Sequence, residues 1–247
     1  MGPGKGYGMS LDRYVYPGTN VLVNKFGITD LGKLSGVERM SSAANAMLLM
    51  REGVTGRFDR QHIRDIHRRI FGDVYGWAGE FRDIRIWKGS GTEFVAPGGI
   101  EAEIDGLCGR IRDAGYFQRL DHDGAANAFA DVMADLNGIH PFREGNGRTQ
   151  RAFIGQLALN AGYDLDFTKM SENDMWNASM AAAHGNRNLM RYLFRDAMSE
   201  RIYEPGSVRG NALHEEHVPR RQGAFSRLMT LLGKADRKDD GLDGHAL

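Results

Sequence analysis

The chain has 247 residues, of which 41% are hydrophobic and 26% charged, and its formal net charge is zero. This composition is typical of a globular protein, and the balanced charge argues against direct binding of nucleic acid, which usually shows as a basic excess. The single cysteine, Cys108, excludes an intrachain disulfide framework. No apolar run approaches the roughly 20 residues of a membrane span, so we expect a cytoplasmic protein without a membrane partner.

Residues 1–10 are glycine-rich and lack the apolar core of a signal peptide, which predicts a flexible lead-in to one domain over residues 11–203. Most of this domain shows apolar residues at helical spacing. Asp59 and Asp123 are candidate N-caps, and Gly72 is a stop signal. The pattern predicts a mostly α fold with helices over residues 41–50, 59–72, 100–114, 123–136, 149–161, 172–183 and 189–202.

Residues 82–96 are the exception to the helical pattern. Polar and apolar side chains alternate over residues 82–87, as in a β-strand, and residues 89–91, Gly-Ser-Gly, are typical of a turn. Residues 92–95 would then form the returning strand, so the pattern is typical of a β-hairpin. A lone hairpin is marginally stable, so it either offers its free edge to an extended peptide or is a surface excursion without a role. The pattern alone favours neither.

The composition changes at residue 204, where Glu-Pro-Gly-Ser interrupts the helical pattern. Residues 204–247 are predicted to be a partly disordered tail. Within it, residues 224–232 place apolar side chains at helical spacing, which indicates a short amphipathic helix that docks on the body or on a partner.

Residues 140–151, His-Pro-Phe-Arg-Glu-Gly-Asn-Gly-Arg-Thr-Gln-Arg, lie between two predicted helices, the second beginning at Thr149. The N–H groups of Gly145, Asn146 and Gly147 would form an anion nest at that helix N-terminus. Arg148 and Arg151 are three residues apart, share a helix face and carry the forked donors that suit phosphate. The run therefore favours a phosphate site.

Two further residues of this run indicate chemistry. Glu144 would repel a phosphate unless a divalent cation lay between them, and a carboxylate with phosphate oxygens and water is a typical Mg²⁺ shell. His140 has the ordinary pKa of a proton acceptor near neutral pH. Each residue alone better fits a helix junction with surface arginines and a capping histidine. Their joint occurrence favours phosphoryl-group chemistry on a nucleotide.

The run resembles the signature of the Fic family, His-x-Phe-x-Asp/Glu-Gly-Asn-Gly-Arg-x-x-Arg, at every fixed position. The resemblance extends over residues 11–200, including 16–25 and 73–82. It implies the Fic fold, a helical bundle with a single β-hairpin near the active site. That hairpin, the flap, would span residues 82–96 and register the modified segment of a target protein as an added strand.

The resemblance also implies a protein adenylyltransferase that moves AMP from ATP to a target hydroxyl. His140 would be the base, and Glu144 would hold Mg²⁺. Phe142 would anchor the loop, and Lys88 and Asn177 are weaker candidates for contacts with nucleotide or target. The phosphates would be held by Gly145, Asn146, Gly147, Arg148 and Arg151.

Many members of the family carry an inhibitory helix with the pattern Ser/Thr-x-x-x-Glu-Gly/Asn. Residues 168–173 match its letters, but they follow the signature helix and look like the start of the next core helix, so we interpret the match as chance. The chain then resembles toxins whose inhibitory glutamate comes from a small separate antitoxin and captures Arg151. Such toxins modify the B subunits of bacterial type II topoisomerases.

Three alternatives remain open on the sequence. The chain could be a host-directed effector that modifies GTPases. It could transfer or remove another phosphate-containing group, although the phosphorylating relatives depart from the signature where Glu144 and Gly145 conform to it. It could also be a non-catalytic binding protein, which the intact His140 and Glu144 disfavour.

Overall fold

The computed structural model describes residues 12–52, 56–87, 93–202 and 204–206. These residues form a helical domain, as predicted, with seven α-helices and three short 3-10 helices within the described part. The helices are α1 Leu31–Glu52, α2 Arg60–Phe71, η1 Pro97–Gly99, α3 Ile100–Asp113, η2 Gly115–Phe117, α4 His122–Ile139, α5 Asn146–Asn160, η3 Phe167–Lys169, α6 Glu172–Ala183 and α7 Asn188–Ala197.

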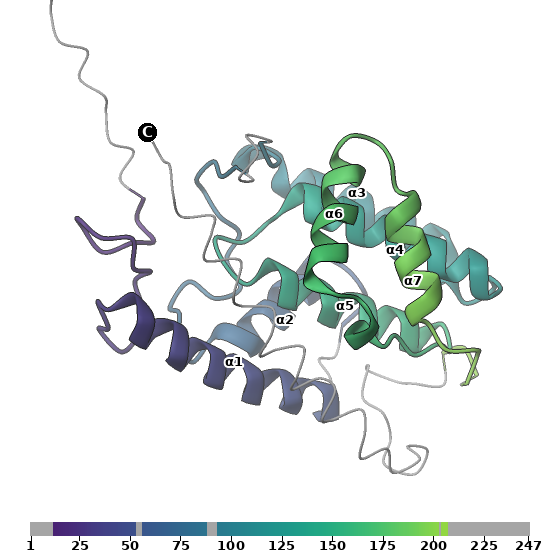
Figure 1. The fold of residues 1–247 in the computed structure, drawn as a ribbon, viewed down its shortest axis with the longest axis horizontal. Coiled ribbons are helices and arrows are strands. Elements are labelled where there is room, and N and C mark those ends of the chain that lie inside the picture. The colour runs from purple at the N-terminus through teal and green to yellow at the C-terminus, as the bar shows by residue number, and fades with distance from the viewer. Residues whose placement is uncertain (1–11, 53–55, 88–92, 203, 207–247) are drawn as a thin grey trace, which may run out of the picture.

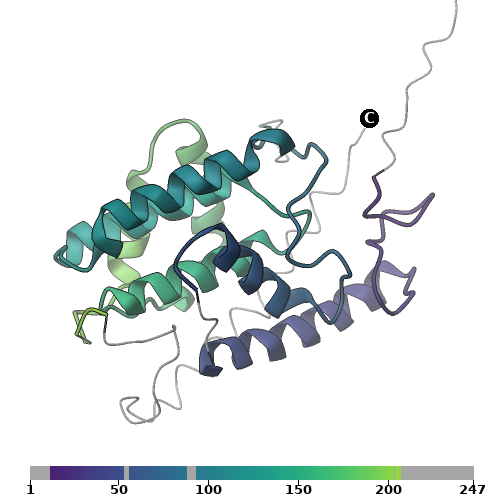
Figure 2. The same cartoon turned by 180° about the vertical axis from the view of Figure 1, so that it is seen from behind.

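Helix α4 is the centre of the packing. It contacts α3, α5, α6 and α7, while α2 contacts α1, α3 and α5. Figure 1 shows α6 and α7 in front, and Figure 2 shows α2 and α3 from the opposite side, with α4 and α5 between these layers. The long α1 runs along one edge of the domain in both views. The signature residues therefore begin at the end of the central helix.

Local sequence signals explain the helices that match their predictions. Asp59 accepts a hydrogen bond from the His62 N–H and so caps α2, and Gly72 ends it. Ser171 caps α6 in the same way through the Asp174 N–H. The predicted apolar stripe of α3 is buried, including Cys108, and burial raises the pKa of the Cys108 thiol to about 12.

Four predicted boundaries were wrong. Helix α1 begins at Leu31 rather than Ser41, because the Asp30 carboxylate accepts from the Lys33 N–H and starts the helix earlier. Helix α4 is capped by Asp121 rather than Asp123. Helix α5 begins at Asn146 rather than Thr149. Helix α7 ends at Ala197 rather than Ile202, because Met198 is extended and forms an antiparallel bridge with Leu165.

The predicted hairpin is not confirmed. The described residues of 82–96 contain no β-strand; they contain one isolated antiparallel bridge, Trp87 to Glu93, and a hydrogen bond from the Phe94 N–H to the Ile86 carbonyl. Lys88 and the tail segment 224–232 lie outside the described residues. In the part of the chain that the structure describes, no helix combines the length and apolar character of a membrane span.

Candidate active site

The signature residues form a tight connection between α4 and α5. His140 ends α4 in the left-handed conformation, with φ 49° and ψ 64°, and Gly145 precedes α5 with φ 79°. The first-turn N–H groups of α5, which have no carbonyl partner inside the helix, therefore belong to Asn146 and the residues after it. The fold thus brings a histidine and a positive helix end to the two sides of one short loop.

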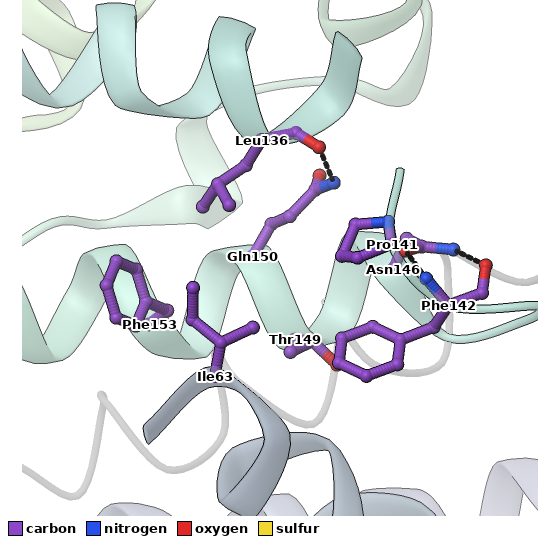
Figure 3. A pocket seen from close by; sticks show the side chains of 8 residues that line it. All are labelled: Ile63, Leu136, Pro141, Phe142, Asn146, Thr149, Gln150 and Phe153. Atoms are coloured by element: carbon purple, nitrogen blue, oxygen red, sulfur yellow. Dashed lines mark hydrogen bonds between the residues drawn. The ribbon is translucent and has the colours of Figure 1, made fainter. Parts of the chain in front are cut away.

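Asn146 fixes the shape of this loop. Its side-chain oxygen accepts from the Phe142 N–H at 2.9 Å, and its side-chain NH₂ donates to the Phe142 carbonyl at 2.8 Å, as Figure 3 shows. Gln150 joins α5 to α4 through the Leu136 carbonyl. A small cavity beside the loop is lined by Asn146, Phe142, Gln150 and Leu136, among others, as Figure 3 shows. It measures about 10 Å³, which is room for one water molecule, so a nucleotide has to bind elsewhere along the loop.

Gly145 is required by the loop geometry. A Cβ built there would lie 2.3 Å from Phe71 Cε2, whereas a Cβ on Gly147 would meet only the Arg151 guanidinium, at 3.4 Å. The Gly145 N–H donates to the carboxylate of Glu144 at 2.6 Å. The Glu144 side chain therefore folds back over the N-terminus of α5, and its own carboxylate holds one of the N–H groups predicted to bind phosphate.

The two glycines predict opposite effects on stability. Gly145→Ala should lower the free energy of unfolding by about 2 to 4 kcal/mol, because it adds left-handed strain to a clash with Phe71. Gly147→Ala lies inside a helix and should be neutral or stabilising by up to about 1 kcal/mol. Urea unfolding of both variants measures the difference, and equal stability would contradict the described loop geometry.

Arg148 is held by α1. Its guanidinium donates to Glu38 at 2.6 Å and to Ser42 at 2.8 Å, and it lies 4.4 Å from the centre of the Phe71 ring. Tyr75 donates its hydroxyl to the same Glu38 carboxylate, and burial together with this charge raises the pKa of Tyr75. Arg148 is thus buried in an ion pair, and its predicted contact with phosphate would have to use donors not engaged by α1.

Glu144 lies at the edge of this network. Its carboxylate is 3.6 Å from Arg148, and its side chain is 27% exposed, so it remains accessible to a ligand. Among the described residues, no group of three or more His, Cys, Asp or Glu could hold a metal ion. A Mg²⁺ ion held by Glu144 would therefore take its other ligands from phosphate oxygens and water, which suits an ion that arrives with a nucleotide.

His67 on α2 packs against the loop and hydrogen-bonds to it. It is fully buried, and its ring stacks on Phe142 with centroids 3.8 Å apart. The Gly79 N–H donates to Nδ1 at 2.8 Å, so the ring proton is on Nε2, which donates to the Glu144 carbonyl at 3.0 Å. Burial lowers the pKa of His67 to about 3, and the ring is neutral at physiological pH.

This shift predicts a pH dependence of stability. The folded pKa of His67 is below its unfolded value, so the unfolded state binds the extra proton and stability falls as pH drops below about 6.5. Between about pH 7.5 and pH 5 the loss from His67 should be about 2 kcal/mol. Denaturant unfolding of His67→Gln should show a correspondingly flatter pH profile than the wild type, and a profile as steep as that of the wild type would contradict the buried neutral state of His67.

The remaining predicted site residues are placed as follows. Arg151 is half-buried on α5, and its guanidinium reaches back to Gly147 at the helix N-terminus. Asn177 is exposed in the middle of α6, and its contact on the adenine side stays a prediction. The imidazole of His140 stacks on Phe94, with ring centroids 4.0 Å apart, which places the segment after residue 92 beside the candidate base.

Sequence reasoning missed Glu38, His67 and Arg82. Arg82 is 2% exposed and hydrogen-bonds to the His140 carbonyl. Glu38 and His67 each lie on a buried helix face, Glu38 between Leu34 and Ser42 in α1 and His67 beside Ile66 in α2. A charged or titratable residue on a buried face is the signal that could have found them.

The chain matches the Fic/DOC family over residues 57–158. It is 33% identical over 198 residues to a probable protein adenylyltransferase Fic of Salmonella typhimurium, covering 78% of this chain and 96% of that protein. It is 37% identical over 194 residues to the protein adenylyltransferase VbhT of Bartonella schoenbuchensis, covering 78% of this chain but only 40% of VbhT. The chain belongs to the Fic/DOC family, and its enzyme class is that of the protein adenylyltransferases.

Solved structures agree with this assignment. The BepC protein of Bartonella tribocorum, a VirB-translocated effector with bound AMPPNP, superposes with a TM-score of 0.69 at 30% identity, covering 76% of this chain and 96% of that one. The N-terminal Fic domain of a putative cell filamentation protein from Bartonella quintana gives a TM-score of 0.70 at 31% identity, with coverages of 77% and 93%. The helical Fic fold is thereby confirmed.

Proposed function

We propose that this protein transfers AMP from Mg-ATP to a hydroxyl side chain of a target protein, with His140 as the base. The observation that carries the proposal is the placement of His140 and the N-terminus of α5 at the two ends of one loop fixed by Asn146. A base and an anion-binding helix end are the two groups that hydroxyl attack on a nucleotide phosphate requires. The bound AMPPNP of BepC and the bound ADP of a related Bartonella quintana structure support ATP as the substrate.

In the proposed reaction, the target hydroxyl oxygen attacks the α-phosphorus of ATP. The new O–P bond forms as the bond from the α-phosphorus to its bridging oxygen breaks, and pyrophosphate leaves. The hydroxyl proton passes to His140. Because Nδ1 of His140 is buried, Nε2 would be the nitrogen that accepts it.

The loop residues would bind and orient the phosphates. The first-turn N–H groups of α5, Arg151 and any accessible donors of Arg148 would hold the phosphate oxygens. Glu144 would hold Mg²⁺, which would neutralise charge on the phosphates. Lys88 and Asn177 stay candidates for contacts with nucleotide or target. Such a site acts by positioning and by electrostatic stabilisation of the transition state.

Labelled ATP tests the proposal. The protein is incubated with a bacterial lysate, Mg²⁺ and ATP carrying label on either the α- or the γ-phosphate. Label in protein from the α position alone is the expected result. Label from the γ position would show phosphoryl transfer instead, and no label from either, after removal of any co-purified inhibitor, would indicate a binding protein.

We propose further that the enzyme acts as the toxin of a toxin–antitoxin pair. The target, a type II topoisomerase B subunit, would dock on residues 82–96, and the antitoxin would supply a glutamate to Arg151. The position of Arg151 over the N-terminus of α5 suits this control, since a glutamate there would occupy the place of a phosphate. The alternative is a host-directed effector that modifies GTPases, which the likeness to VirB-translocated effectors favours.

Growth distinguishes the two roles. Expression in bacterial cells without any antitoxin should arrest growth, because AMP transfer would inactivate a bacterial target. His140→Ala, expressed to the same level, should leave growth unchanged. A chain that transfers AMP in vitro but does not slow bacterial growth would contradict the toxin role and support the effector.

A further inference from the structure

Arg82 is buried where the segment of residues 82–96 meets the end of α4. Its side chain makes four hydrogen bonds to backbone carbonyls, and its own N–H makes a fifth. The acceptors are Ile84 O with Nη1 at 2.7 Å, Val95 O and Ile139 O with Nη2 at 2.6 and 3.2 Å, His140 O with Nε at 2.8 Å, and Pro141 O with the backbone N at 2.9 Å. One side chain thereby joins both arms of the segment to the signature loop.

A guanidinium suits this position for two reasons. Its planar fork spreads five N–H donors over three nitrogens and so reaches acceptors that lie apart, whereas lysine has three donors on a single nitrogen. Its charge lies at the C-terminal end of α4, where the unpaired carbonyls and the helix dipole favour a cation. Burial lowers the pKa of Arg82 to about 10, so the charge persists at neutral pH.

These hydrogen bonds affect both the backbone and the side chain of His140. His140 is left-handed, a conformation that costs a non-glycine residue about 1 to 2 kcal/mol, and Arg82 holds the carbonyls of His140 and of the residue before it. Arg82 also holds the Val95 carbonyl, while the Val95 N–H donates to Gly138. Val95 follows Phe94, whose ring stacks on the His140 imidazole. Arg82 therefore holds the backbone of His140 directly and acts on its ring through Val95 and Phe94.

We propose that Arg82 is a positioning residue, which orients the His140 imidazole and couples it to the segment of residues 82–96. The kinetic consequence rests on the proposed function of His140 as the base. The structural consequence, a fixed orientation of the imidazole, stands independently of it. A displacement of the order of 1 Å in a reacting group costs about 100-fold in rate, which sets the expected effect.

The matched control is Arg201. It also bridges backbone carbonyls, those of Gln118 and Leu120, but at the N-terminal end of α4. The 18 residues of α4 place that end about 27 Å from His140. Arg201→Lys therefore tests the loss of guanidinium bonds to backbone carbonyls, fewer than those of Arg82 and made by an exposed side chain, without any contact to the candidate base.

The experiment compares Arg82→Lys, Arg82→Gln and Arg201→Lys in the full chain. Long-range ¹H–¹⁵N NMR spectra of histidine-labelled protein report each imidazole, and the signal lost in His140→Ala identifies His140. In both Arg82 variants the His140 signals should move while most other histidine signals stay. Transfer of AMP from α-labelled ATP should fall about 100-fold with Mg-ATP affinity unchanged within twofold. Arg201→Lys should show neither change.

Two results would overturn the proposal. One is a folded Arg82→Lys variant with wild-type His140 signals and a wild-type transfer rate. The other is loss of the fold in both Arg82 variants, since Arg82 would then stabilise the whole domain and not orient one ring. If the wild type transfers no AMP, the proposed function fails, but the NMR spectra still decide whether Arg82 orients His140.

Discussion

Replacing His140 with alanine should reduce AMP transfer by about 100- to 10,000-fold, the usual contribution of a positioned general base. The loss should appear in the rate and not in Mg-ATP affinity, because the phosphates would be held by α5 and the loop. Rapid-quench measurement of transfer from α-labelled ATP, together with nucleotide titration, separates the two quantities.

Two companion variants make this test specific. His140→Asn should be as inactive as His140→Ala, but asparagine tolerates the left-handed conformation that this residue adopts, so it guards against a local folding defect. His184→Ala removes an exposed histidine at the end of α6 and should retain full activity. Undiminished transfer by a folded His140→Asn variant would rule out the base assignment.

Replacing Glu144 with alanine should lower the transfer rate by about 100-fold or more at fixed Mg²⁺, since a metal ion contributes several kcal/mol to stabilising charge in phosphate chemistry. Excess Mg²⁺ should restore part of this rate, because nucleotide phosphates and water would supply the remaining ligands. Mg²⁺ titrations of the initial rate measure both effects. Normal activity with unchanged Mg²⁺ dependence would contradict the metal role.

Glu172→Ala is the matched control for Glu144→Ala. Glu172 lies in the first turn of α6, where an acid complements the helix dipole, as expected for a chance match to the inhibitory pattern. Its removal should leave the rate unchanged. An increased rate in this variant would show that residues 168–173 inhibit the enzyme after all.

The sequence predicted those features that depend on neighbouring residues. The bounds of α2 and α6 follow from the caps Asp59 and Ser171, and the signature loop contains its own fixing residue, Asn146. The start of α1 was missed because Gly32 and Gly36 have low helix propensity, which tertiary packing of that helix overrides.

The supporting residues of the site were missed because their roles depend on contacts between distant parts of the chain. Glu38 acts on Arg148, and Arg82 acts on the loop after α4. No spacing rule connects such positions. The end of α7 was missed for a similar reason, since the bridge of Met198 to Leu165 replaces a helical turn that the apolar pattern alone would continue.

The most direct test of AMP transfer is peptide mass spectrometry of lysate proteins after incubation with the enzyme and Mg-ATP. We predict a mass increase of one AMP group on a Ser, Thr or Tyr side chain of a protein target, present with the wild type and absent with His140→Asn. A mass increase of one phosphate instead, or an AMP adduct that persists with His140→Asn, would contradict this prediction.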